Sequence, residues 1–270
     1  MISGMNTNTQ RQAADLLWAH WQNGEVMGQL PPVCQPSNRA EGYAVQALLE
    51  TRSASSLFGW KIAATSVAGQ RHIVVDGPIA GRLLAERVLP QGCALSLGAN
   101  RMKVAECEFA FRMGQDLVPQ SEPYSLAKVM AAVASLHPAI EIPDSRYVAF
   151  EKVGAPALIA DSACAHQFML GPASTANWRS FNLATHAVTV TIESAGQSPV
   201  HYHGVGSNVL GDPRFALTWL ANELSELGIT LQAGQVVTTG TCLTPISVQA
   251  GQSLRASFGA LGEISISFLS

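Results

Sequence analysis

The sequence has little charge for its length. Only 13% of its 270 residues are charged, 47% are hydrophobic, and the net charge is −3. No run of lysine or arginine provides an electrostatic surface for nucleic acid or for an anionic membrane, so we expect neither as a partner. A surface so poor in charge also indicates that sister subunits cover part of it, and we therefore expect a homo-oligomer.

Targeting segments are lacking as well. No stretch approaches the roughly 18 uninterrupted apolar residues of a membrane span. Residues 1–12 are polar and have no apolar core of the kind that a secretory signal peptide needs. The five cysteines are scattered and form no C-x-x-C pair, which favours a reducing compartment. We therefore expect a soluble, cytoplasmic protein.

The chain opens with a helical pattern. In residues 10–22, apolar side chains recur at helical spacing along one stripe, at Ala14, Leu17, Trp18 and Trp21. A break that contains proline follows at Leu30–Ser37, and a second helix is predicted over Glu41–Arg52. We predict that residues 1–55 form a helical N-terminal segment packed on the core.

From Leu57 onward the pattern changes to short strands separated by glycine and proline turns. Two predicted helices interrupt these strands, one over Ser125–Leu136 and one that begins at Asp212-Pro213 and ends near Gly228. Because strands and helices do not alternate regularly, we predict an α+β fold with residues 56–270 as one domain. The predicted strands are Phe58–Ala63, Val104–Met113, Ala139–Ile142, Ala187–Ile192, Val236–Thr239, Ser253–Phe258 and Glu263–Phe268.

One predicted strand carries two carboxylates on the same face. Side chains alternate between the faces of a strand, so Glu106 and Glu108 project together, whereas Cys107 and Phe109 belong to a wholly apolar face. The two glutamate Cα atoms lie roughly 6.6–6.8 Å apart, twice the rise per residue, which lets both carboxylates reach one ion. Two like charges on a half-buried face need a compensating cation. Taken alone, the pair also fits an exposed edge strand with basic neighbours.

Glu141 lies in a second short apolar strand, between Ile140 and Ile142. A lone acid in such a run is costly if it is buried without a partner. Glu106, Glu108 and Glu141 together make a set of carboxylates with no histidine or cysteine pair nearby. Such a set suits a hard cation, so the sequence predicts Mg²⁺ or Mn²⁺ rather than Zn²⁺.

Further short motifs stand in order along the chain. They are Gly42–Gln46, Gly59–Ser66, Asp76–Pro78 with Gly81, Asp144–Arg146, Ala160-Asp161, Leu210–Pro213, Trp219–Asn222 and Thr239–Thr241. Together with the three glutamates, their order and spacing over about residues 42–268 resemble the 2-keto-4-pentenoate hydratase / 4-oxalocrotonate decarboxylase family of the fumarylacetoacetate hydrolase-like superfamily. The resemblance implies a lyase with a mixed β-roll of curved sheets, helices outside it, and Glu106, Glu108 and Glu141 as metal ligands.

The third implied ligand distinguishes branches of that superfamily. The C–C bond hydrolases typically have aspartate at this position and a histidine-centred acid–base pair upstream. Here the position is Glu141, and no histidine lies between His20 and Lys61. The resemblance therefore favours the hydratase and decarboxylase branch.

Lys61 is predicted to transfer protons. It lies in mid-strand beside Phe58 and Trp60, where desolvation lowers a lysine pKa toward neutrality and suits it to acid–base work. The alternative is a surface lysine whose ammonium group reaches solvent, and the resemblance favours the functional role. Asp76 is predicted to be the partner that keeps Lys61 charged, or else a residue that only forms the turn after it.

The resemblance also implies substrate contacts. Asp161 and Cys164 lie in a segment near the family's substrate, where this sequence departs from the usual Asn and Ser pattern. Thr241 can hydrogen-bond a substrate carboxylate or simply form a turn. Arg146 is predicted to meet the far end of the substrate.

The implied substrate is a small 2-oxo or 2-hydroxydienoic acid. A divalent ion would act as a Lewis acid toward its 2-oxo group, which hydration and decarboxylation both require. We predict hydration of 2-hydroxypenta-2,4-dienoate (2-keto-4-pentenoate) to 4-hydroxy-2-oxopentanoate in meta-cleavage degradation of aromatic compounds. The alternatives are a 4-oxalocrotonate decarboxylase, with Arg146 or His166 on the second carboxylate, an acylpyruvate-type C–C hydrolase, and a catalytically silent partner subunit.

Overall fold

A computed structural model describes residues 4–270, so the first three residues of the predicted segment 1–55 lie outside it. Two helices open the described chain, α1 (Thr7–Asn23) and α2 (Arg39–Glu50). Each begins at an asparagine, Asn6 or Asn38, whose side chain accepts hydrogen bonds from N–H groups of the first turn. Gly24 ends α1 in the left-handed conformation, with φ 66°. Both helices lie where the sequence predicts them.

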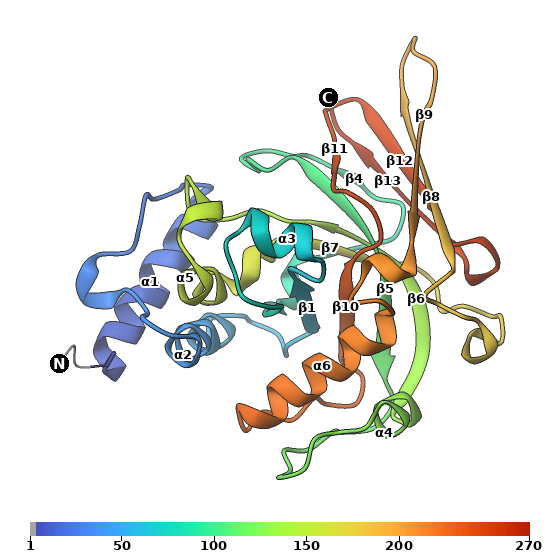
Figure 1. The fold of residues 1–270 in the computed structure, drawn as a ribbon. Helices are drawn as coiled ribbons and strands as arrows, with labels where there is room; N and C mark the ends of the chain where they lie inside the picture. Colours follow the sequence, from blue (N-terminus) through green and yellow to red (C-terminus); the bar gives the residue numbers. More distant parts are fainter. Residues whose placement is uncertain (1–3) are drawn as a thin grey trace.

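The N-terminal helices pack against a helix from the middle of the chain, α5 (Ala155–Ala160), at one side of the molecule (Figure 1). Leu17 of α1, Leu49 of α2 and Ala157 of α5 belong to one apolar cluster, distinct from the main core. The division of the chain near residue 55 stays a prediction.

The strands of residues 4–270 form two sheets. The larger has the order β2-β1-β10-β5-β6-β7-β3, and β11 pairs with β5. Its pairs are antiparallel except for β1 with β10 and β3 with β7. The strands are β1 (Gly59–Ala63), β2 (Ile79–Leu83), β3 (Val88–Leu89), β5 (Val104–Met113), β6 (Val133–Ile142), β7 (Gln167–Leu170), β10 (Val236–Thr241) and β11 (Ile246–Ser247).

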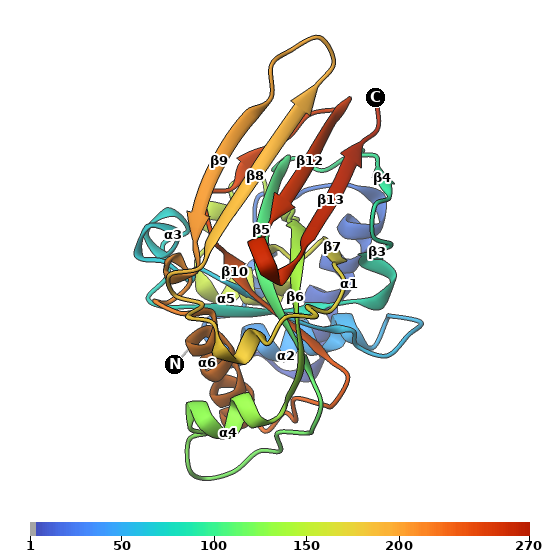
Figure 2. The ribbon, with the colours of Figure 1, turned by 90° about the vertical axis from the view of Figure 1, so that its right-hand side faces the viewer.

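The smaller sheet has the order β4-β13-β12-β8-β9 and lies across β5 and β6 (Figure 2). Buried and exposed residues alternate along β8 and β13, so one face of this sheet is buried. The Phe109 ring of β5 meets the Phe258 ring edge-on, with 5.0 Å between centroids, in the core between the sheets. The strands are β4 (Ala94–Leu95), β8 (Ala187–Ser194), β9 (Val200–Val205), β12 (Gln252–Ser257) and β13 (Glu263–Phe268).

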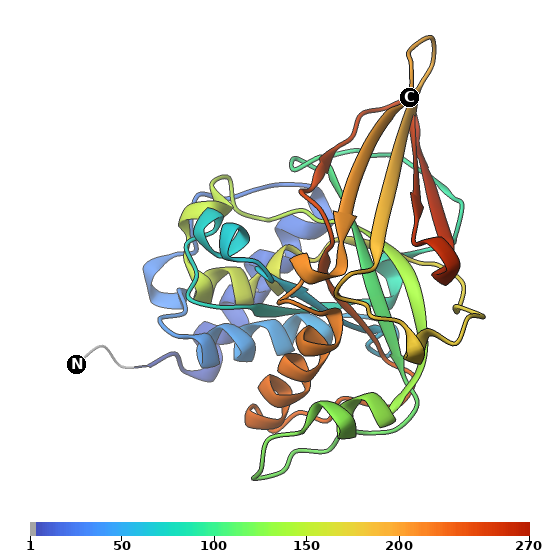
Figure 3. The same cartoon turned by 45° about the vertical axis from the view of Figure 1, so that its right-hand side comes forward.

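Further helices connect these strands: α3 (Val67–His72), α4 (Leu126–Ala131) and α6 (Pro213–Glu226). The side chain of Asp212 caps α6 and Pro213 occupies its first turn, as predicted. Helices α4 and α6 lie side by side at one end of the molecule (Figure 3). Within residues 4–270, no helix combines the length and apolarity needed to cross a membrane.

The second half of the predicted helix Ser125–Leu136 is wrong. The helix α4 ends at Ala131, and β6 begins at Val133. This strand pairs with β5 along its length, with Leu136 opposite Phe111, and that pairing overrides the local helical pattern. The predicted strands are confirmed in position, but β2, β3, β4, β7, β9 and β11 were not predicted from the sequence, and three of these have two residues each.

Candidate metal centre

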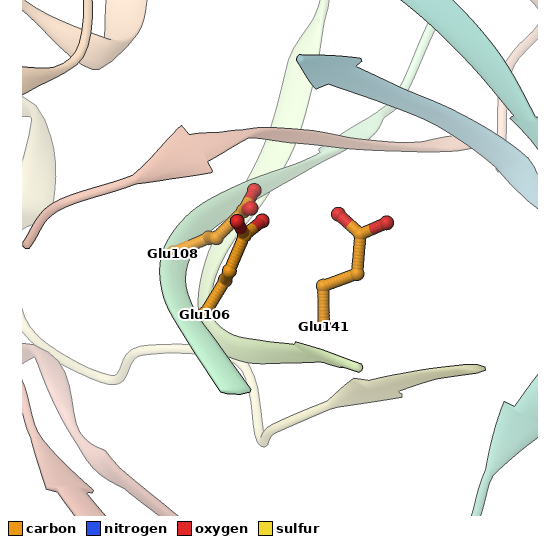
Figure 4. A group of neighbouring side chains, drawn as sticks. All are labelled: Glu106, Glu108 and Glu141. Carbon is orange, nitrogen blue, oxygen red and sulfur yellow. The ribbon is translucent and has the colours of Figure 1, made fainter. Parts of the chain in front are cut away.

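The three predicted glutamates meet on two neighbouring strands. β5 carries Glu106 and Glu108, and β6 carries Glu141 directly opposite Glu106 in the antiparallel ladder. Each residue offers a carboxylate oxygen, and these oxygens all lie within 4.8 Å of one another. Figure 4 shows the three side chains extending from their strands toward a common region. Glu108 and Glu141 are buried, and Glu106 is half-buried.

The other face of β5 explains why these carboxylates are held in place. Cys107, Phe109 and Phe111 all lie in the main core with 0 to 1% of their surface exposed. A strand that anchors one face in the core directs the alternate side chains to the opposite face. The glutamates therefore project together, as the alternation predicts.

Two donors from β10 hold Glu108. The Thr238 hydroxyl donates a short hydrogen bond to Oε2 of Glu108. The N–H of Gly240 donates to the same oxygen at 2.7 Å. The other oxygen, Oε1, is buried and has no hydrogen-bond partner among the described residues.

Glu141 also has acceptors that protein groups do not satisfy. Within residues 4–270, neither of its oxygens has a hydrogen-bond partner. Lys61 Nζ lies 3.2 Å from Oε1 as an ion pair, without hydrogen-bond geometry. Buried polar atoms left in this way indicate that a bound ion or water completes them. Three converging carboxylates with free oxygens fit a divalent, oxygen-preferring cation.

Without a cation, burial disfavours the charged form of these carboxylates. It raises the pKa of Glu141 to about 7, against the opposing effect of Lys61. Burial, and then the charges of Glu141 and Glu106, raise the pKa of Glu108 well above its ordinary value. A divalent ion would reverse this tendency, because it favours the charged form of every ligand around it.

Lys61, on β1, lies beside the three glutamates. Its ammonium group donates to the Ala163 carbonyl at 3.0 Å, and the residue is 3% exposed. Burial lowers the pKa of Lys61, but the charges of Glu141 and Glu106 outweigh burial and raise it above its ordinary value. In this arrangement the shift of the Lys61 pKa is opposite to the predicted fall toward neutrality, because the desolvated ammonium has carboxylate neighbours.

The predicted pairing of Asp76 with Lys61 is also wrong. The side chain of Asp76 is 88% exposed and lies 3.5 Å from the guanidinium of Arg39. Glu141 takes the place of the acid beside Lys61. The sequence places Asp76 only 15 positions after Lys61, but the loop between β1 and β2 carries its side chain outward.

Asp161 and Arg146 form a buried ion pair with each other. Asp161 accepts from the Arg146 guanidinium and also from the Ser145 hydroxyl at 2.7 Å. Arg146 further donates to the carbonyls of Asp144 and Ala165, each at 3.1 Å. Asp161 and Arg146, both predicted to contact the substrate, thus bind each other in an internal network. A direct substrate contact by either residue stays a prediction.

Cys164 and Thr241 lie beside other residues of the site. Cys164 is 8% exposed in the turn that meets Lys61, and burial raises its thiol pKa to about 12. Thr241 pairs with Glu108 across β10 and β5, but its hydroxyl donates to the Leu243 carbonyl at 2.7 Å. A substrate contact by either residue stays a prediction.

The sequence reasoning missed the contacts made by Thr238, Gly240 and the Ala163 carbonyl, although Gly240 lies in the motif Thr239–Thr241. An isolated glycine inside a strand pattern indicates a bulge or a close backbone approach, so Gly240 had a usable signal. A Cβ there would lie 2.2 Å from the Thr65 hydroxyl, and its φ is +99°. Nothing local marks Thr238 or the carbonyl, since their roles depend on which strands and turns become neighbours.

The chain as a whole is similar to named enzymes. No family model matches the chain. It is 31% identical over 261 residues to 2-keto-4-pentenoate hydratase 2 of Dechloromonas aromatica strain RCB, covering 95% of this chain and 96% of that protein. It is 28% identical over 274 residues to 4-oxalocrotonate decarboxylase of Pseudomonas putida, covering 98% of this chain and 100% of that protein.

A solved structure also resembles the whole chain. The 4-oxalocrotonate decarboxylase of Pseudomonas putida G7, complexed with magnesium and adipate, matches it with a TM-score of 0.84 at 26% identity. The match covers 99% of this chain and 100% of that one. The predicted α+β, fumarylacetoacetate hydrolase-like fold is confirmed.

Proposed function

We propose that this chain, which belongs to the 2-keto-4-pentenoate hydratase / 4-oxalocrotonate decarboxylase family, is a metal-dependent hydratase of 2-hydroxypenta-2,4-dienoate. The product is 4-hydroxy-2-oxopentanoate. The observation that carries the proposal is the set of three carboxylates, with free buried oxygens, beside a buried lysine. A lyase of this kind would serve meta-cleavage degradation of aromatic compounds.

Glu106, Glu108 and Glu141 would hold Mg²⁺ or Mn²⁺, because both ions prefer oxygen ligands and accept water in the remaining positions. When bound, the ion supplies Lewis-acid chemistry at the 2-oxo group of a chelated substrate. The glutamates themselves have one task, which is to present charged oxygens from two rigid strands.

Lys61 is the proposed proton carrier. An ammonium group has three N–H donors, and its contact with Ala163 and its ion pair with Glu141 leave a further N–H for the substrate. In the reaction the 2-hydroxyl group of the dienol loses its proton and C5 gains one, which gives the unsaturated ketone. The oxygen of water then bonds to C4 as water loses one proton, and C3 gains one. Because Lys61 is 3% exposed, these proton transfers would occur away from bulk water.

The direct test is turnover. Purified protein with Mg²⁺ or Mn²⁺ should bleach the ultraviolet absorbance of 2-hydroxypenta-2,4-dienoate and yield 4-hydroxy-2-oxopentanoate. Chelation of the metal should stop the reaction, and added metal should restore it. Failure to turn over any C5 or C6 dienol acid would overturn the proposal.

Decarboxylation of 4-oxalocrotonate is a second candidate, supported by the likeness to the decarboxylase structure. It requires a positive group for the second carboxylate, and Arg146 and His166 were the predicted groups. Arg146 is already paired with Asp161. Burial and the charges of Arg146 and Arg87 lower the pKa of His166 to about 3, so this ring is neutral. These contacts support hydration, and measuring CO₂ release against water addition separates the two reactions.

Two other predicted alternatives have equally direct tests. An acylpyruvate-type C–C hydrolase would release pyruvate together with a second acid. A catalytically silent partner subunit would show no turnover alone, and its metal titration need not reveal any binding. Both outcomes differ from that expected of a hydratase.

The compartment and the assembly are proposals as well. All five cysteines in the described chain are free, and three of them are fully buried. Unpaired cysteines fit a reducing, cytoplasmic compartment. We also propose a homo-oligomer, and sedimentation or light scattering of the purified protein would give its order.

A further inference from the structure

Glu108 differs from the other two glutamates in how protein groups hold it. Its Oε2 accepts from the Thr238 hydroxyl and from the Gly240 N–H. Its Oε1 has no hydrogen-bond partner among the described residues, although it is buried. One oxygen is thus held by β10, and the other is free to meet a ligand.

An irregularity in β10 makes this contact possible. Thr238 pairs with Ala110 of β5, and Thr241 pairs with Glu108, so three steps along β10 match two along β5. Such a bulge releases a residue from the regular ladder and re-aims its groups. Gly240 lies in the bulge with φ +99°, and its N–H points to the carboxylate of Glu108.

We propose that Thr238 is a positioning residue of the metal centre: with the Gly240 N–H, it fixes the rotamer of Glu108 so that Oε1 faces the cation. The proposal rests on the metal site of the proposed function and adds a residue outside its set of ligands. Groups that hydrogen-bond a ligating carboxylate fix its orientation, and their loss typically weakens metal binding about 10–100-fold.

The neighbouring residue provides a matched control. Thr239 is also 0% exposed on β10, but its hydroxyl donates to the Phe109 backbone carbonyl at 2.9 Å. Replacing either threonine by valine keeps the shape of the side chain and removes one buried hydrogen bond. The two variants therefore differ in whether the lost bond belonged to a metal ligand.

The experiment is calorimetric titration of the intact protein with Mn²⁺, for wild type, Thr238→Val, Thr238→Ser and Thr239→Val. We expect Thr238→Val to raise the Mn²⁺ dissociation constant about 10–100-fold. Thr238→Ser keeps the hydroxyl and should restore binding to within about twofold. Thr239→Val should also bind within about twofold of wild type, even if its melting temperature falls as far as that of Thr238→Val.

Each other outcome has a distinct meaning. If the wild type binds Mn²⁺ and Thr238→Val binds it equally well, the positioning role is overturned and the metal centre stands. Equal weakening in Thr238→Val and Thr239→Val also overturns it, because the effect is then general destabilisation. No binding by the wild type overturns the metal centre itself, and the positioning role with it. If the valine variants do not fold, Thr238→Ala and Thr239→Ala give the same comparison.

Discussion

At the scale of single residues, the main feature of the candidate site is its group of buried carboxylates. Glu108 and Glu141 have no exposed surface, and Lys61 lies within salt-bridge distance of Glu141. The carboxylate oxygens of the group lie within 4.8 Å of one another. Like charges so close repel unless protons or a cation offset them. Each glutamate therefore matters for its charge more than for its packing.

The first prediction removes one of these charges. Glu106→Gln keeps the size of the side chain, and we expect it to abolish binding of Mg²⁺ or Mn²⁺ and hydratase activity together. The melting temperature without metal should not fall, because a repulsive charge is lost. Metal titration and circular dichroism measure the two effects.

A suitable control for this substitution is Glu193→Gln, which changes an exposed glutamate on β8. It should bind metal as the wild type does. Activity that survives Glu106→Gln would show that the site has been assigned to the wrong residues.

His166 is a half-buried titratable residue that the fold favours in its neutral form. Its Nδ1 accepts from Trp21 Nε1 at 2.8 Å. Burial, and then the charges of Arg146 and Arg87, lower its pKa from 6.5 to about 3. Below pH 6.5, therefore, the unfolded chain binds a proton at His166, whereas the folded protein does not.

The second prediction follows from that difference. The folded pKa is lowered, so the stability that neutral His166 contributes is present above pH 6.5 and is lost as the pH falls toward 3. Between pH 6.5 and 5 the loss should be on the order of 1–2 kcal/mol. We expect the melting temperature of wild type to fall more steeply over this range than that of His166→Asn, whose side-chain oxygen can still accept from Trp21. Parallel profiles would contradict the assignment.

At the scale of elements, a left-handed turn places the lysine. Ser162, Ala163 and Cys164 have φ values of 50°, 51° and 63°. Residues other than glycine rarely adopt this conformation, and it persists only where the surroundings hold it. Here the buried pair of Asp161 and Arg146 adjoins the turn, and the Ala163 carbonyl accepts from Lys61.

The third prediction tests the contact between this turn and β2. A Cβ atom at Gly81 would lie 1.9 Å from the Ser162 carbonyl oxygen, so Gly81→Ala must displace the turn. We expect a loss of stability of about 1–3 kcal/mol. We also expect at least a tenfold fall in kcat, because the Ala163 carbonyl moves away from Lys61.

Gly77→Ala is the matched control, since a Cβ there meets nothing within 4 Å. It should leave both kcat and the melting temperature close to the wild-type values. The idea that the turn positions Lys61 fails if Gly81→Ala is destabilised but retains full kcat.

At the scale of the whole molecule, the cation would link parts of the fold that are distant in the chain. Glu106 and Glu141 come from different strands, and Glu108 is braced by β10. An unfolded chain does not hold these groups together, so a metal that binds them stabilises the folded state. At an ion concentration of 100 times the dissociation constant, binding adds about 2.7 kcal/mol to the free energy of unfolding.

The fourth prediction is the thermal effect of metal removal. Chelation by EDTA should lower the melting temperature by roughly 5 °C for a chain of this size when the ion is at 100 times its dissociation constant. Glu106→Gln should show no such shift, because it binds no ion. An equal shift in both proteins would place the stabilising metal elsewhere in the molecule.

Local patterns in the sequence determined much of this protein. The alternation of side chains placed Glu106 and Glu108 on one face of a strand, and the capping residue Asp212 marked the start of α6. The strand of Lys61 was also predicted from its residues and confirmed. These features depend on spacings of a few residues, and such spacings can be read along the chain.

The tertiary structure alone decided which groups meet. The β5–β6 register placed Glu141 opposite Glu106, and the bulge in β10 aimed Thr238 and Gly240 at Glu108. In the same way, Asp76 turned outward, although the sequence had indicated it as the partner of Lys61. Strand pairing and register bring together residues that are far apart in the chain. Local propensity does not specify which distant strand will pair with a given segment, so it cannot predict these contacts.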